Sequence, residues 1–224
     1  MIFAFPVAGR YDFVSENFYA SATSYRCYGC NGVGPAFEID ENDIISPILM
    51  DLTAGDTPDE NKPHMIEAFD GSIWLAFAGG SVQQSGTGLP LTWNGFLGAA
   101  EYGMGEEITG LERSGGDVLI VRTRRHTHGF YKDGSGGYVN KIISNRAGGI
   151  LWTNQQLDTS YAVDDSGLTN VNRVQEFGDF AGGTISDLVQ PILHAHIEAS
   201  DIVGSLIYRG ENTYAVMFSN GDGL

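Results

Sequence analysis

Two cysteines and two His-x-His runs are the residues whose types could build a metal centre. Cys27 and Cys30 lie in the sequence CYGC, and a zinc site would need a second ligand pair from the run at 126–128 or the run at 194–196. On a strand, an H-x-H run places both rings on one face. The spacing matches no zinc-finger or knuckle pattern, and CYGC does not open a helix after a strand, as a thioredoxin-type site does. We therefore expect two reduced thiols in a protein assembled in the cytosol, and no metal.

Two acidic clusters and one glycine run could bind an ion or a phosphate. The clusters, Asp40–Asp43 and Asp56–Asn61, lack the alternating ligands and the central glycine of a calcium loop. The run Gly134–Gly137 follows Asp133 and precedes Tyr138, which indicates a hairpin loop rather than a phosphate cradle. We interpret all three segments as loops.

The sequence contains no G-x-S-x-G elbow, Walker loop, H-E-x-x-H motif or dinucleotide fingerprint. No pattern marks the paired carboxylates of a glycosidase either. Trp74, Trp93 and Trp152 could stack against a sugar, but Trp74 stands inside an alternating strand and Trp152 follows Ile150-Leu151, which favours core positions. We therefore expect no enzyme activity and no cofactor. A carbohydrate-binding or carbohydrate-active protein is the alternative.

Composition favours short strands joined by glycine turns. The 224 residues are 42% hydrophobic and 11% aromatic, only 18% are charged, and there are 31 glycines. With 28 acidic and 12 basic residues the net charge is −16, so counterion release cannot drive tight wrapping of DNA. The run Met1–Pro6 is apolar but lacks the basic n-region of a signal peptide, and it ends too early for a signal peptide or a membrane span. We expect a strand there.

The densest basic run is Arg122 to Arg125. Alternation along a strand would place Arg122 and Arg124 on one face. We expect these two residues and Arg125 to contact an acidic loop of a neighbouring subunit.

A strand, a tight turn and a second strand recur along the chain at intervals of roughly 45 residues, the length of a four-stranded propeller blade. This period predicts an all-β chain with an array of β-propeller blades at 65–224, after a β-rich entry segment with acidic loops at 1–64. An irregular β-sandwich is the alternative. The four hairpins are Met65–Phe77, Ile108–Thr123, Ser160–Thr169 and Ile207–Phe218.

The last hairpin raises a question about its partner. Tyr214–Phe218 reads as a strand, and Asn220-Gly221 is a strong signal for a type I′ turn, but no return strand follows. Since four blades are too few to close a stable ring, we expect a partial propeller that belongs to a longer chain or is completed by a partner.

One segment has helical spacing instead. Thr184 or Ser186 can cap a short helix at 185–193. Pro191 removes a backbone donor in mid-helix, so we expect the helix to bend or end there and His194–Glu198 to lead back toward a strand.

Two stretches resemble the tail nozzle (tail tubular) β-propeller proteins of short-tailed bacteriophages. Gln175–Ser186, continuing into Val189–Leu193, is similar to the segment where a blade of those proteins closes with a glycine-aspartate turn and a short helix. Tyr208–Gly221 is similar to their recurring strand that ends in phenylalanine and an Asp/Asn-Gly turn. With the blade pattern of Ile108–Tyr131, the resemblance covers about half of the chain. The residues that carry the two motifs are Gly178, Asp179, Phe180, Arg209, Asn212, Tyr214, Phe218 and Gly221.

The resemblance implies a structural protein of the virion tail, assembled in the host cytoplasm. The resemblance also implies a homo-oligomeric ring of six subunits, below the tail adaptor and near the tail fibre proteins. The ring surrounds the path of the ejected DNA without binding it. The acidic surplus suits this role, because an acidic lining repels phosphates at many points.

Overall fold

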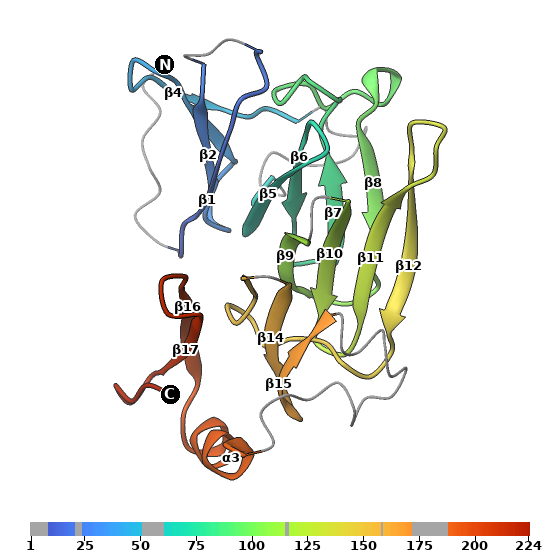
Figure 1. Cartoon of the computed structure of the whole chain (residues 1–224). Helices are drawn as coiled ribbons and strands as arrows, with labels where there is room; N and C mark the ends of the chain where they lie inside the picture. Colours follow the sequence, from blue (N-terminus) through green and yellow to red (C-terminus); the bar gives the residue numbers. More distant parts are fainter. Residues whose placement is uncertain (1–8, 21–23, 51–60, 115–116, 158, 172–187) are drawn as a thin grey trace. The chain divides into compact units, whose positions relative to one another are not determined.

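The computed structural model describes residues 9–20, 24–50, 61–114, 117–157, 159–171 and 188–224 (Figure 1). The chain divides into two compact units, Met1–Glu107 and Ile108–Leu224. The division expected from sequence, between residues 64 and 65, falls inside the first unit and stays a prediction.

The first unit contains two antiparallel sheets in which strands adjacent in sequence are adjacent in space. The first sheet consists of β1 (Asp12–Glu16), β2 (Arg26–Cys30), β3 (Phe37–Ile39) and β4 (Ile45–Pro47). The second consists of β5 (Met65–Phe69), β6 (Ser72–Ala76), β7 (Ser81–Gln84) and β8 (Ala100–Gly103), with the short 3-10 helix η2 (Gly95–Leu97) before β8.

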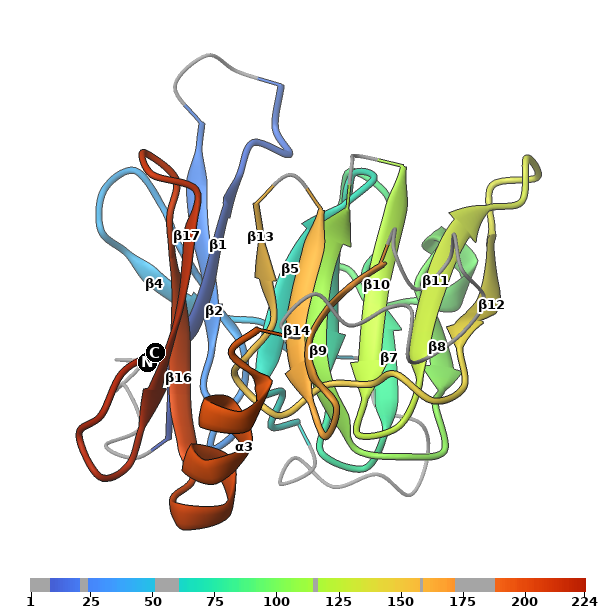
Figure 2. The ribbon, with the colours of Figure 1, turned by 60° about the horizontal axis from the view of Figure 1, so that its bottom comes forward.

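The second unit repeats this arrangement with fewer strands in each successive sheet; Figure 2 shows its first sheet, β9 to β12. That sheet consists of β9 (Ile108–Ser114), β10 (Val118–Thr123), β11 (Thr127–Lys132) and β12 (Tyr138–Ser144). Next come β13 (Gln155–Gln156), β14 (Ser160–Asp164) and β15 (Gly167–Asn170), then α3 (Gln190–Ala199), and last β16 (Ile202–Tyr208) and β17 (Thr213–Phe218).

These meanders confirm the expected all-β chain of propeller-type blades, and each of the four predicted hairpins forms. The turn at Asp70-Gly71 shows the local cause, because φ is +51° and +75° at these residues and Phe69 pairs with Ser72. Positive φ at both central residues defines a type I′ hairpin turn. The sheet β1–β4 has the same meander, but the hairpin repeat did not predict it, because β3 and β4 have three residues each.

The helix differs from its expected position. It runs from Gln190 to Ala199, so Pro191 lies in its first turn and the segment His194–Glu198 is helical rather than a return to a strand. Proline suits this place because the first backbone donors of a helix have no intrahelical acceptor and the ring presets φ. The caps expected at Thr184 or Ser186 lie outside the described residues.

The turn after β17 also differs in type. The Gly221 N–H donates to the Phe218 carbonyl over 3.0 Å, and φ is positive at Gly221 but not at Asn220, which is a three-residue loop with a left-handed glycine. A return arm does follow, because Leu224 and Val216 exchange backbone hydrogen bonds of 2.8 and 3.0 Å. The last residues therefore begin to pair with β17.

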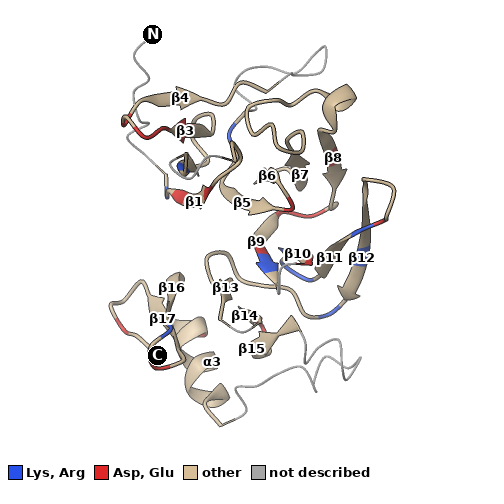
Figure 3. Ribbon diagram, turned by 45° about the horizontal axis from the view of Figure 1, so that its top comes forward, with Lys and Arg blue, Asp and Glu red and all other residues tan. Residues whose placement is uncertain are grey.

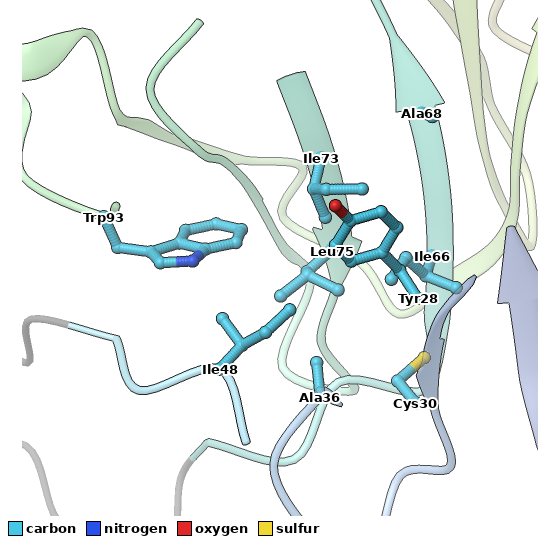
Figure 4. Close-up of a cluster of buried hydrophobic side chains, with 9 residues drawn as sticks. All are labelled: Tyr28, Cys30, Ala36, Ile48, Ile66, Ala68, Ile73, Leu75 and Trp93. Carbon is cyan, nitrogen blue, oxygen red and sulfur yellow. The ribbon is translucent and has the colours of Figure 1, made fainter. Parts of the chain in front are cut away.

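Each unit has an apolar cluster of its own. In the first unit the side chains come from strands of both sheets and from the connecting residues Ala36, Ile48 and Trp93, as Figure 4 shows. They are Tyr28, Cys30, Ala36, Ile48, Ile66, Ala68, Ile73, Leu75 and Trp93. In the second unit a cluster joins β14, α3 and β17 through Val163, Leu193, Val216 and Phe218.

Gly71→Ala should lower the free energy of unfolding by about 1–2 kcal/mol, because a Cβ disfavours the left-handed region and would lie 3.3 Å from Thr87 Cγ2. The control is Gly79→Ala, where no atom lies within 4 Å and φ is outside the left-handed region. Urea unfolding of both variants measures the difference. Equal stabilities would contradict the type I′ assignment.

Candidate functional site

The candidate metal ligands do not assemble. No group of three or more His, Cys, Asp or Glu side chains that could hold a metal occurs among the described residues. Cys30 is fully buried in the apolar cluster, and burial raises the pKa of both Cys27 and Cys30 above the usual thiol value. His194 and His196 lie on α3, where residues two apart point to different sides, so the expectation of two rings on one strand face is wrong for that pair.

Arg122, the first arginine of the basic run, is buried rather than at the surface. Arg122 lies in β10 with only 1% of its surface exposed, so it is not available as a contact to a neighbouring subunit, and that expectation is corrected. Its guanidinium donates to the Ser160 hydroxyl over 2.9 Å and to the carbonyl oxygens of Ser160 and Gly148 over 3.3 and 3.2 Å. A further bond of 3.3 Å reaches the Thr127 hydroxyl. The side chain therefore joins β10 to β14 in the next sheet.

Glu112 supplies the counter-charge for this arginine. It lies in β9, is 6% exposed, and places Oε1 3.8 Å from Arg122 Nε. The Ser160 hydroxyl donates to the same carboxylate oxygen. Burial lowers the pKa of Arg122, and the charge of Glu112 opposes that shift. The three side chains form one network, which we call the arginine network: Glu112, Arg122 and Ser160.

A second buried carboxyl lies in the same region. Asp164, at the end of β14, is 3% exposed, and burial raises its pKa to about 6, although Arg122 and the Ser166 N–H act in the opposite direction. Its Oδ1 accepts a hydrogen bond from Ser166 N over 2.7 Å. Two carboxyl groups, those of Glu112 and Asp164, are thus buried near Arg122 inside the second unit.

Other side chains of the second unit bond to the backbone of a neighbouring sheet or connection. Asn154 Nδ2 donates to the Thr109 carbonyl over 2.7 Å. Gly110 permits this approach, because a Cβ there would lie 2.1 Å from Asn154 Cγ. Gln155 Nε2 donates to the Ser205 carbonyl over 3.1 Å. These contacts use polar groups to hold adjacent sheets together.

The described residues of the tail-protein motif take part in the same kind of contact. The Tyr214 hydroxyl donates to the Thr153 carbonyl over 2.5 Å, and burial raises the pKa of this phenol. Arg209 Nη2 donates to the Gln156 carbonyl over 3.1 Å. Phe218 is buried in the apolar cluster, whereas Asn212 and Gly221 have positive φ in the turns. The other motif residues, Gly178, Asp179 and Phe180, lie outside the described residues.

The remaining arginines of the basic run lie at the surface beyond the end of β10. Arg124 forms an ion pair with Asp165 of the same unit, and Arg125 is exposed. Arg124 and Arg122 therefore do not share a strand face. A subunit contact stays a prediction for Arg124 and Arg125.

Two of the predicted loops are described. Asp40–Asp43 connects β3 and β4 (Figure 3). The Asp40 carboxylate accepts hydrogen bonds from the backbone N–H groups of Asn42 and Ile44. The Gly134–Gly137 run connects β11 and β12, with Asp133 accepting from Ser135, so the hairpin-loop interpretation is confirmed. Residues 56–60 of the other acidic cluster lie outside the described residues.

Sequence reasoning missed Glu112, Ser160 and Asp164. The available signal was Glu112 itself, a charged residue that directly follows Leu111 in the strand ITGLERS. A buried charge needs a partner of opposite sign, but the sequence does not say which one.

Comparisons with known proteins support the fold class. No protein-family model matches the sequence, and no curated protein matches it. The extracellular domain of a hybrid two-component system from B. thetaiotaomicron is similar at a TM-score of 0.56 and 9% identity, over 94% of this chain and 26% of that chain. Virginiamycin B lyase from Staphylococcus aureus is similar at a TM-score of 0.52 and 10% identity, over 96% of this chain and 73% of that chain.

BBS1N in complex with ARL6DN is a weaker match, with a TM-score of 0.43, 11% identity and coverage of 70% of this chain and 49% of that chain. This chain thus spans about half of BBS1N and about a quarter of the two-component protein's domain. The two-component domain and virginiamycin B lyase are β-propeller proteins, and the fold of this chain is of the β-propeller class. None of them is a phage tail protein. At such identities the likeness concerns the fold alone.

No helix in the described part of the chain has the length and apolar character needed to cross a membrane.

Arg122→Met should lower the free energy of unfolding by about 3–5 kcal/mol, because it leaves Glu112 buried without its counter-charge. Adding Glu112→Gln should recover part of the loss, since the second charge is then removed as well. Urea unfolding of the two single variants and the double variant completes the cycle. Additive losses would contradict a coupled network.

Asp164→Asn should stabilise the protein above pH 6. The folded pKa of about 6 exceeds the ordinary 3.8, so the folded state carries a penalty for the charged carboxyl at neutral pH that disappears as pH falls from 6 toward 3.8. The amide removes the penalty, a gain of up to about 3 kcal/mol at pH 7.5 that shrinks as pH falls from 6 and is lost below about pH 4. Urea unfolding across this pH range, with the surface variant Asp165→Asn as the control, measures it. A gain independent of pH would contradict the assignment.

Proposed function

We propose that this chain is a structural β-propeller protein without enzyme activity. The observation that carries the proposal is the use of its polar side chains. Arg122, Glu112 and Ser160 are buried, Ser160 is hydrogen-bonded to both of the other two, and Arg122 forms an ion pair with Glu112. Tyr214 and Arg209 bond to the backbone of adjacent segments. Groups committed in this way stabilise a scaffold and do not face a substrate.

Within this class we propose a subunit of a tail nozzle ring in the virion of a short-tailed phage. The support is the resemblance of Tyr208–Gly221 and of Gln175–Leu193 to the nozzle family, together with the net charge of −16. The ring, six subunits by resemblance, would lie below the tail adaptor, contact tail fibre proteins and let DNA pass during ejection. An acidic surface opposes adsorption of phosphates along such a path.

The alternative is a carbohydrate-binding or carbohydrate-active propeller. Two of its three candidate stacking residues are in the core, because Trp74 and Trp93 are 0% and 7% exposed. Trp152 is half-buried and has a φ of +67°, and its carbonyl accepts a hydrogen bond from Ser205. One tryptophan gives this alternative less support than the scaffold proposal has.

The purified protein should form rings that electron microscopy and native mass spectrometry resolve as a discrete homo-oligomer. At physiological salt it should bind duplex DNA no more tightly than about 10⁻⁴ M, the weak end of non-specific binding, because it is acidic overall. Fluorescence anisotropy with labelled duplex measures this binding. A monomer at all concentrations, tight DNA binding or turnover of a polysaccharide would overturn the proposal.

A further inference from the structure

The outer strand of the first sheet in the second unit presents an open edge. β12 is the last strand in the order β12-β11-β10-β9, so among the described residues it pairs with β11 alone. It has seven residues and no proline, and four consecutive residues from Val139 to Ile142 are exposed. Such an edge carries a row of backbone donors and acceptors that another strand can pair with.

The side chains of this edge suit protein contact. Val139 is 41% exposed and Ile142 is 60% exposed. Because these residues are three positions apart on a strand, they point to opposite faces, so apolar surface flanks the open backbone on both sides. Strand addition to a sheet edge uses this combination: the backbone bonds give affinity and the alternate side chains give specificity.

The charge of the edge identifies the kind of partner. Lys141 and Arg146 are exposed on β12 and just after it, and Lys141 lies over the Tyr131 ring at 5.6 Å from the centroid. The first unit has the opposite character, since it holds more than half of the 28 acidic residues and only three of the 12 basic ones. A basic edge in an acidic protein is complementary to the first unit of another copy.

The first unit offers a matching outer strand. β4 is the last strand in the order β1-β2-β3-β4, and the loop before it exposes Glu41 and Asp43, followed by Ile44 at 59% exposure. Asp40 accepts backbone hydrogen bonds from Asn42 and Ile44 over 2.8 and 2.9 Å, so the loop is pre-organised. These bonds hold the pKa of Asp40 below its usual value.

We propose that the open edge of β12 binds the β3–β4 hairpin, Asp40–Pro47, of a second copy of this chain. Glu41 and Asp43 of one copy would then face Lys141 and Arg146 of the next. Because the two surfaces differ, the contact is heterologous and continues from copy to copy, and it gives a ring when the rotation between successive copies closes. The inference rests on the proposed ring and names the surface that builds it.

Charge reversal tests the contact. Lys141→Glu and Asp43→Lys should each weaken self-association at least tenfold in sedimentation velocity at physiological salt, and the double variant should recover most of the loss because the pair is restored with reversed signs. The control is Lys62→Glu, which makes the same change of charge at an exposed site of the first unit and should leave association unchanged. Circular dichroism confirms that each variant is folded.

Hydrogen exchange separates the failure of this inference from the failure of the proposed function. The amides of Val139 to Ile143 should exchange at least tenfold more slowly in the assembled protein than in a dilute monomer. Rings that form while these amides exchange freely, or charge variants that associate normally, would overturn the β12 contact and leave the ring proposal standing. A protein that stays monomeric would overturn both.

Discussion

The second unit depends on a buried positive charge that the protein itself must satisfy. The guanidinium of Arg122 has almost no contact with water. It donates hydrogen bonds to Ser160 and the Gly148 carbonyl and forms an ion pair with Glu112. Taking such a charge out of water costs several kcal/mol unless its partners are well placed. The sheets β9–β12 and β13–β15 are therefore held in one relative position, since another position would leave the charge without partners.

Stacked blades need contacts of this kind because no backbone ladder connects one sheet to the next. In the second unit Asn154, Gln155 and Tyr214 each bond to the backbone of another element. The first unit uses the same device between β1 and β5, where the Asp12 carboxylate accepts a hydrogen bond from the Ile66 N–H over 2.9 Å. Asp12 is thus a titratable group that lies between two sheets, and burial raises its pKa. Apolar packing holds each unit together. The hydrogen bonds between sheets fix how one sheet is positioned against the next.

This use of polar groups connects the fold to the proposed role. Arg122, Glu112 and Asp164 are buried inside the second unit, as suits the scaffold that we propose. Exposed charges include Glu41 and Asp43 in the loop before β4 and Lys141 of the edge strand β12. Surfaces of this kind determine what a scaffold binds, and the opposite charge of the β12 edge and the first unit gives self-association a physical basis.

The sequence by itself determined the local structure of this protein. Short-range signals such as Asp70-Gly71 gave the hairpins correctly, because the conformation of a turn depends on its own residues. The same signals misplaced the helix by reading Pro191 as an interruption, and assigned two positive φ values to Asn220-Gly221 where only Gly221 has one. Both errors concern where an element begins or how a loop closes, which neighbouring segments influence.

Tertiary structure decided that both faces of β10 are buried, from Leu119 to Thr123. Alternation places Arg122 on one face of a strand, but it does not say whether another sheet covers that face. The partners that make the buried position tolerable are Glu112 and Ser160, which lie 10 positions before and 38 positions after Arg122 in the sequence. Only folding brings these three residues together, so a sequence that reads as a basic surface run contains the central ionic contact of the second unit.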